Sequence, residues 1–171
     1  MNEFERRKLE IAQNHVDFIS VMRQMNANAV VEYFGYSLQI GSAASPLLNG
    51  VTQQGTIAIQ ANADFVMQYL ITSVVHPDVL NIAATSLQVL LQITDTGNGD
   101  VLFNQPTPAG LVSGTPLGAM TGVPILMPVP RIIPSNTIVK VEATQMGVGG
   151  AGNLEPVGFY FSMLGARVSK V

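Results

Sequence analysis

The segment Ser86–Thr94, SLQVLLQIT, decides the fold class because its side chains alternate in character. Its odd-numbered positions are large and apolar: Leu87, Val89, Leu91 and Ile93. Its even-numbered positions include the polar residues Gln88, Gln92 and Thr94. Successive side chains of a β-strand point to opposite faces, so a period of two predicts a strand with one buried face.

The same period continues through most of the chain after Asn28. The other candidate strands are Val30–Ile40, Thr56–Gln60, Asp64–Val75, Asp100–Asn104, Val123–Ile133, Thr137–Thr144 and Gly158–Val168. In the third of these, strict alternation predicts one shared face for Phe65, Met67, Tyr69 and Ile71. Connectors rich in Gly, Pro, Ser and Asn separate the segments. About eight antiparallel strands of this kind predict a mostly β chain, a β-sandwich with the jelly roll as the first option.

Residues 1–26 follow a helical period instead. At 100° per residue, one stripe of the predicted helix carries Phe4, Ile11, Phe18, Met22 and Met25. With the apolar residues beside it, the apolar arc covers roughly 200°, about twice what one core requires. Two interpretations follow: a helix in a groove of its own domain, or a helix between its own sandwich and a neighbouring subunit. We therefore divide the chain into an amphipathic docking helix (1–26) and a β-sandwich domain (27–171).

The charge content limits the possible partners. Only 11% of the 171 residues are charged, whereas 47% are apolar, and a typical domain has about 25% charged residues. No Lys or Arg occurs from Gln24 to Pro130. Nucleic acids and anionic membranes both require clustered cations, so we expect neither as a partner. The neutral surface that remains predicts coverage by other protein subunits, first of all by copies of the same chain.

The segment from Val123 to Pro134 contains four prolines among large apolar residues. Proline cannot donate a hydrogen bond to a sheet, which predicts an edge strand or an extended arm. In the first case Ile125 belongs to the core of its own sandwich; in the second it contacts a neighbour. Arg131 is an interface candidate, with an ordinary surface arginine as the alternative.

Residues for catalysis or cofactor binding do not form any recognisable motif. The two histidines, His15 and His76, fall on the predicted helix and before a proline, and the chain has no cysteine. The acidic turn TDTGNGD at 94–100 has two interpretations: a calcium loop, or a hairpin turn built on Asn98-Gly99. We favour the hairpin, and we expect no enzyme activity, no cofactor and no metal.

Three segments resemble small virion proteins of tailed bacteriophages. They are Pro128–Val141, with its Pro-Arg arm and Pro-x-Asn-Thr turn, Gly158–Val168, and Asp95–Pro108. The resemblance covers about 75 residues of the chain and implies a β-sandwich that decorates the head or forms part of the neck or collar in many copies. Its implied partners are capsid, portal or neck proteins.

The sequence therefore predicts a non-enzymatic, self-assembling component of a tailed-phage particle. We expect it in the virion, after assembly in the host cytoplasm. The alternative is a carbohydrate-binding or adhesive module of a fibre. Such sites use exposed aromatic rings, and the candidates here are Tyr33 and Tyr36.

Overall fold

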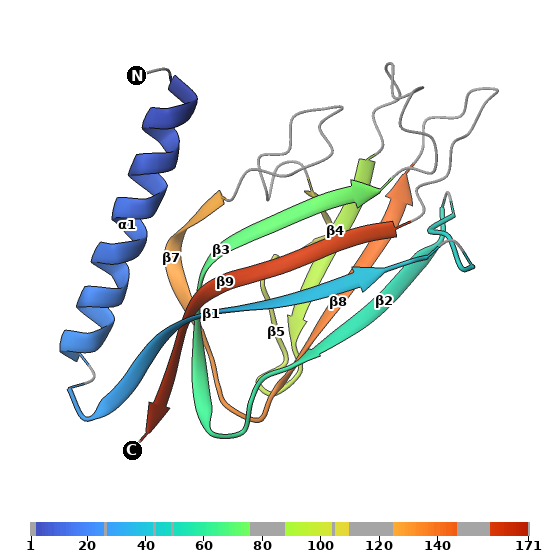
Figure 1. The fold of residues 1–171 in the computed structure, drawn as a ribbon. Helices are drawn as coiled ribbons and strands as arrows, with labels where there is room; N and C mark the ends of the chain where they lie inside the picture. The colour runs from blue at the N-terminus through green and yellow to red at the C-terminus, as the bar shows by residue number, and fades with distance from the viewer. Residues whose placement is uncertain are drawn as a thin grey trace.

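The computed structural model describes residues 3–25, 27–42, 44–48, 50–75, 88–103, 105–109, 125–146 and 158–170. In this part of the chain one helix, α1 (Glu3–Met25), precedes two packed antiparallel sheets (Figure 1). The strands are β1 (Ala29–Ile40), β2 (Thr52–Ala58), β3 (Ala63–Val75), β4 (Gln88–Asp95), β5 (Asp100–Val101), β6 (Thr107–Pro108), β7 (Ile125–Ile133), β8 (Ile138–Met146) and β9 (Gly158–Lys170). All eight predicted strands are present, and β6 is an addition.

The strand order is that of a jelly roll. One sheet has the order β1-β9-β3-β7 and is called the long sheet below. The other, the short sheet, has the order β2-β8-β4-β5, with β6 also paired to β4. Apart from β4 to β6, consecutive strands alternate between the two sheets, so most connections cross the sandwich. The predicted β-sandwich is confirmed.

The main core lies between the two sheets. Phe65, Phe159 and Phe161 of the long sheet are fully buried there, opposite Leu91 and Val141 of the short sheet. The predicted alternation holds in β4, where every described odd-numbered position is at most 2% exposed. No helix residue whose side chain is described belongs to this core cluster. The described helix side chains therefore pack elsewhere.

A β-bulge in β3 corrects one prediction. Phe65 and Met67 face the core as expected, but the register with β9 shifts between Met67 and Tyr69. The extra residue, Gln68, moves every later side chain of β3 to the opposite face, because side chains alternate with a period of two. Leu70 therefore enters the core, whereas Tyr69 and Ile71 lie on the outer face with Val66.

The proline-rich segment forms β7, which pairs only with β3 and is an edge strand of the long sheet. Ile133 is 1% exposed in the core, and Met127 packs partly against it. Pro128 and Pro130 fall where the register with β3 is interrupted. The edge-strand interpretation therefore holds for the backbone, and the interpretation as an arm detached from its own sandwich is wrong.

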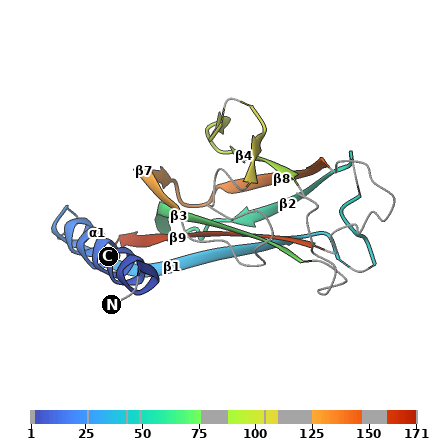
Figure 2. The ribbon, with the colours of Figure 1, turned by 90° about the horizontal axis from the view of Figure 1, so that it is seen from above.

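The helix stands at one end of the sandwich, beside the long sheet. Figures 1 and 2 both show α1 there, with the C-terminus of the chain at the same end. In Figure 1 the N-terminal end of α1 extends beyond the strands. The side chains of Phe4, Ile11, His15 and Met25 lie outside the described residues, as does His76.

Candidate assembly surface

A second apolar cluster joins the helix to the outer face of the long sheet. Phe18, Ile19 and Met22 pack over four sheet residues: Val31, Val66, Ala166 and Val168. These four come from β1, β3 and β9 and are at most 9% exposed. Two predicted interface residues, Phe18 and Met22, thus contact the sandwich of their own chain. Such packing accounts for most of the stability of an amphipathic helix in a protein.

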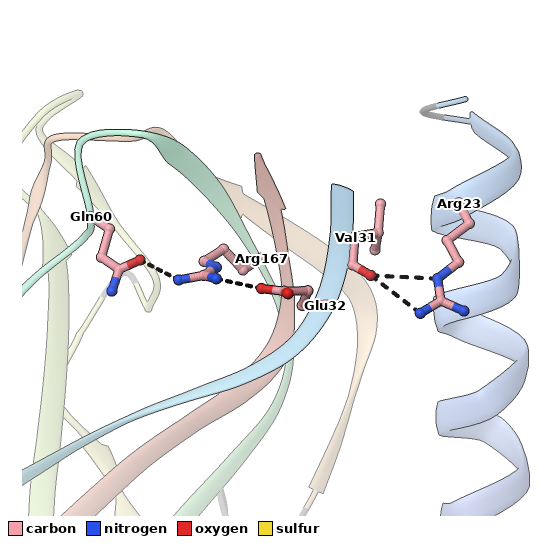
Figure 3. Close-up of polar contacts among 5 residues, drawn as sticks. All are labelled: Arg23, Val31, Glu32, Gln60 and Arg167. Atoms are coloured by element: carbon pink, nitrogen blue, oxygen red, sulfur yellow. Dashed lines mark hydrogen bonds and ion pairs between the residues drawn. The ribbon is translucent and has the colours of Figure 1, made fainter. Parts of the chain in front are cut away.

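A polar contact supports the same junction. The guanidinium group of Arg23 donates from Nε and Nη2 to the carbonyl oxygen of Val31, each at 3.4 Å (Figure 3). Both atoms are at the outer limit of hydrogen-bonding distance, so the bonds are weak. The apolar cluster is therefore the main attachment of the helix.

Two rows of residues cross the outer face of the long sheet from β1 to β7. The first row is Tyr33, Ala166, Val66 and Ile132, paired in register across all four strands. The second row is Gly35, Leu164, Tyr69 and Leu126, paired in the same way. The helix cluster reaches the middle of the first row and includes no member of the second. Neither row contains a charged residue.

Large apolar side chains on this face remain accessible to solvent. Ile132, Tyr33 and Leu126 are 64%, 53% and 44% exposed. Burial raises the pKa of the Tyr69 hydroxyl, and the neighbouring Tyr33 adds to this shift. Burial also raises the pKa of Tyr33. Because both shifts are upward from 10.0, both tyrosines are neutral at physiological pH and the two rows carry no charge.

The outer face of the short sheet has the opposite character. Its two middle rows are Gln54, Glu142 and Gln92, and Thr56, Lys140 and Thr94. Lys140 and Glu142 form an ion pair at 2.9 Å. The Thr52 and Thr144 hydroxyl groups are 2.7 Å apart on this sheet. The middle of this face is thus polar, whereas Ile138 and Met146 at the two ends of β8 are 46% and 47% exposed.

Arg167 organises the end of the sandwich nearest the helix. Its guanidinium group pairs with the carboxylate of Glu32 and donates to Oε1 of Gln60 at 2.6 Å (Figure 3). It also lies 5.0 Å from the centre of the Phe34 ring. These contacts connect β9, β1 and the segment between β2 and β3. They stabilise the register of the strands on which α1 packs.

Replacing Arg167 with alanine is expected to lower the free energy of unfolding by about 2 kcal/mol. A partly exposed ion pair contributes up to about 1 kcal/mol, and the hydrogen bond and the ring contact each add roughly as much. Arg167→Lys keeps the charge but lacks the planar fork that reaches Gln60 and Glu32 together, so we expect about half of that loss. Urea titration measures both values. Equal stability of all three proteins would contradict the structural role of Arg167.

The two predicted interface residues on β7, Arg131 and Ile125, lie near opposite ends of the strand. Arg131 lies beside Met67 in register and donates from Nη2 to Oδ2 of Asp100 at 2.6 Å. The pair is partly exposed, and such pairs contribute about 0–1 kcal/mol to stability. Ile125 begins β7, and its side chain lies outside the described residues.

The acidic turn between β4 and β5 is a hairpin. Asp95 is 1% exposed, and its two carboxylate oxygens accept hydrogen bonds from the Gly97 amide and the Asn98 side chain. The other acid, Asp100, is paired with Arg131, whose positive charge opposes a bound cation. The turn glycine Gly99 has φ of +70°. These contacts favour the hairpin interpretation over the calcium loop.

The two tyrosines considered for sugar binding do not form one platform. Tyr36 packs edge-on against Phe34 and Phe65 at 4.9 and 5.0 Å, inside the sandwich. Its hydroxyl accepts a hydrogen bond from the backbone N–H of Gln60. Tyr33 lies on the outer face of the same strand, because adjacent side chains point to opposite sides.

In the described part of the chain, no group of three or more His, Cys, Asp or Glu side chains is placed to hold a metal ion. No described helix is long and apolar enough to cross a membrane.

Comparisons with known proteins assign neither a family nor a function. No protein-family model matches the chain, and no curated protein matches it. A structure of infectious bursal disease virus, Gx strain, is similar at 17% identity and a TM-score of 0.38, covering 83% of this chain and 32% of that one. The crystal structure of the infectious bursal disease virus VP2 subviral particle is similar at 15% identity and a TM-score of 0.31, covering 84% and 38%. This chain thus spans about a third of the length of those chains.

Proposed function

We propose that this chain is a non-enzymatic structural component of a tailed-phage particle, which self-assembles and binds the head or the neck/collar region. The observation that carries the proposal is the difference between the two faces of the sandwich. The middle rows of the short sheet are polar, whereas the two rows of the long sheet are uncharged and expose Tyr33, Leu126 and Ile132.

The uncharged face has the composition of a protein interface. Interface cores are depleted in charged residues and enriched in tyrosine and other large side chains. Monomeric proteins rarely expose large apolar patches, because these promote association. Here the exposed residues Tyr33, Leu126 and Ile132 lie on the two edge strands, and Val66, Ala166 and Tyr69 between them are at most 4% exposed. Only 11% of the residues are charged, so few charges are available elsewhere to keep a single copy apart from others. A protein partner on this face would cover the exposed apolar side chains.

The helix and the two β7 positions have distinct parts in this proposal. Residues 1–26 act as the docking element, attached to their own sandwich through Phe18 and Met22. The stripe positions Phe4, Ile11 and Met25 are proposed contacts with a neighbour, as are Ile125 and Arg131. Val16 and Val21 are 58% and 51% exposed, which leaves further apolar surface of α1 for a partner.

Two of the segments that resemble tailed-phage virion proteins form a turn and a central strand of the sandwich. Pro128–Val141 contains the turn from β7 to β8, where Asn136 has φ of +61° and the Asp64 carboxylate accepts from the Ser135 amide at 2.8 Å. Gly158–Val168 lies within β9, between β1 and β3. The resemblance therefore involves the framework of the fold, and it supports a location in the virion after assembly in the host cytoplasm.

Detection of the chain in purified particles tests this proposal. Quantitative mass spectrometry of the phage that encodes the chain should find many copies per particle. Gold-labelled antibody against the chain should mark either the head or the collar, which separates the two locations. An antibody against the major capsid protein is the control for accessibility. Gradient-purified particles without the chain would contradict the proposal.

A further inference from the structure

We propose that Asn98 is a site of spontaneous deamidation, at which its side-chain amide is converted to a carboxylate. The inference concerns the acidic turn between β4 and β5, which the proposed function does not use. It is carried by the Asn98-Gly99 dipeptide and by the contacts of these two residues in the hairpin. The modification places a negative charge and an altered backbone in a closely packed turn.

The reaction takes place between the Asn98 side chain and the Gly99 backbone. The Gly99 nitrogen loses its proton to the solvent and attacks Cγ of Asn98. The bond from Cγ to Nδ2 breaks, and the leaving nitrogen takes up a proton and departs as ammonia. Water then opens the resulting succinimide ring at either of its two carbonyl groups. One opening gives aspartate, and the other gives isoaspartate, in which the main chain runs through the side-chain carbons.

The attacking nitrogen of Gly99 is not engaged in a hydrogen bond within the described part of the chain, where no group accepts from its N–H. A Cβ atom built on Gly99 would meet nothing within 4 Å, so the space around this residue is open. Glycine also has no side chain of its own that would hinder the approach of the Asn98 side chain. The nitrogen can therefore react without the loss of an existing contact.

The Asn98 side chain has one weak contact. Its Nδ2 donates to Oδ2 of Asp95 at 3.3 Å, which is longer than the usual range of about 2.7–3.2 Å. Both Asn98 and Gly99 are exposed, so water reaches the ring that it must open. The side chain can therefore leave Asp95 and turn toward the Gly99 nitrogen.

The chain contains a second Asn-Gly dipeptide, which provides an internal comparison. It is Asn49-Gly50, and every other asparagine is followed by a residue with a side chain. The Gly50 N–H donates to the carbonyl oxygen of Gln145 at 2.8 Å, and this bond must break before the nitrogen attacks. One backbone hydrogen bond corresponds to a factor of roughly five in rate. We therefore expect Asn98 to react before Asn49.

The turn has little room for either product. A Cβ atom on Gly97 would lie 2.4 Å from Cγ2 of Thr137, so the hairpin packs closely on the turn from β7 to β8. Isoaspartate lengthens the main chain at position 98 by one carbon atom. In both products a carboxylate replaces the amide that donated to Asp95, which is 1% exposed, and like charges in such proximity are unfavourable.

Deamidation therefore weakens a contact between the two sheets. Asp100 follows the modified position by two residues, and its carboxylate pairs with Arg131 at 2.6 Å. Asp100 belongs to β5 at the edge of the short sheet, and Arg131 belongs to β7 at the edge of the long sheet. A shift of the hairpin separates this pair, and the loss is permanent because the amide is not restored.

Incubation of the full-length protein at mildly alkaline pH tests the site. Trypsin leaves both Asn-Gly dipeptides in one peptide, because no Lys or Arg occurs from Gln24 to Pro130, whereas chymotrypsin cuts between them at Phe65 and Tyr69. Mass spectrometry, with isoaspartyl methyltransferase to label isoaspartate, should show Asn98 converting roughly fivefold faster than Asn49. The rate should rise with pH, because the attacking nitrogen must lose its proton. An unconverted Asn98, or an Asn49 that reacts as fast, would overturn the assignment.

Two variants test the effect of the modification on the hairpin. Asn98→Ser has no amide, so its melting temperature should be the same before and after incubation. That of the unchanged protein should fall by roughly 2–4 °C as isoaspartate accumulates, the shift expected for the loss of about one ion pair. Freshly prepared Asn98→Asp carries the charge without the longer main chain and should fall between these two. A fully converted protein that melts like Asn98→Ser would contradict the effect on the sheets. None of these measurements depends on assembly, so the proposed function is tested separately.

Discussion

Gly165→Ala is expected to destabilise the sandwich by about 3 kcal/mol or more, because its new methyl group has no space. A Cβ atom at this position would lie 2.0 Å from the carbonyl oxygen of Val66 and 3.1 Å from the amide nitrogen of Gln68. Both are backbone atoms of β3 at the bulge, and β3 cannot withdraw without breaking its pairing with β9. For a chain of 171 residues, this loss lowers the melting temperature by roughly 6–12 °C.

Gly35→Ala is the matched control on the neighbouring strand. Its Cβ atom would lie 2.8 Å from the Cδ2 atom of Leu164, the far end of a flexible side chain that can rotate away. The Met163 carbonyl oxygen, at 3.5 Å, is at an ordinary contact distance. We expect a change below about 1 kcal/mol. Thermal unfolding followed by circular dichroism compares the two variants. Similar melting temperatures for both would show that the bulge does not approach β9 as closely as described.

The sequence was sufficient to predict the fold because its side-chain periods are local. Alternation located β4 and β8, and the apolar stripe located α1, since both patterns depend only on neighbouring residues. The prolines of β7 indicated an edge strand or an extended arm, and the structure shows the edge strand. The number of strands and their turns made the jelly roll the first option, and the strand order in the structure confirms it.

The bulge in β3 could not be predicted from alternation alone. Asp64–Val75 contains no glycine or proline that marks a break in the period. The deviation depends on Gly165, a residue about 100 positions later, whose missing side chain admits the displaced backbone of β3. Such long-range compensation is visible only when the two strands are paired. The prediction therefore assigned Tyr69 and Ile71 to the wrong face.

The candidate surface was predicted only in part. The helix stripe was identified from its period, and Phe18 and Met22 do pack on the sheet. The two uncharged rows were missed because each combines residues from four strands that are distant in the sequence. A weak signal existed, since outward positions of β1 such as Tyr33, Gly35 and Ser37 lack charge. Arg167 was also missed, because its partners Glu32 and Gln60 come from other segments.

Removal of residues 1–26 is expected to abolish assembly while leaving a folded sandwich. The core between the sheets contains no described helix residue, so we expect it to pack without α1. Loss of the helix uncovers Val31, Val66, Ala166 and Val168, which should lower the free energy of unfolding by about 2–4 kcal/mol. Cooperative unfolding in urea would show that the truncated chain remains folded.

Two point variants in the full-length chain test whether the second apolar cluster attaches the helix to the sheet. Phe18→Ala should release the helix in part and weaken assembly, because Phe18 packs against the second cluster. Val21→Ala alters a helix side chain that is 51% exposed and outside that cluster, so its effect on stability should be below about 0.5 kcal/mol. Equal effects of both changes on stability would contradict the assigned attachment.

Self-assembly is tested most directly by the molar mass in solution of the full-length chain beside the chain without residues 1–26. Light scattering at micromolar concentration, alone and with phage heads added, gives this mass. We predict a closed homo-oligomer for the full-length protein and a folded monomer for the truncated one. A full-length protein that stays monomeric and binds no particle component, or a truncated protein that assembles normally, would contradict the account.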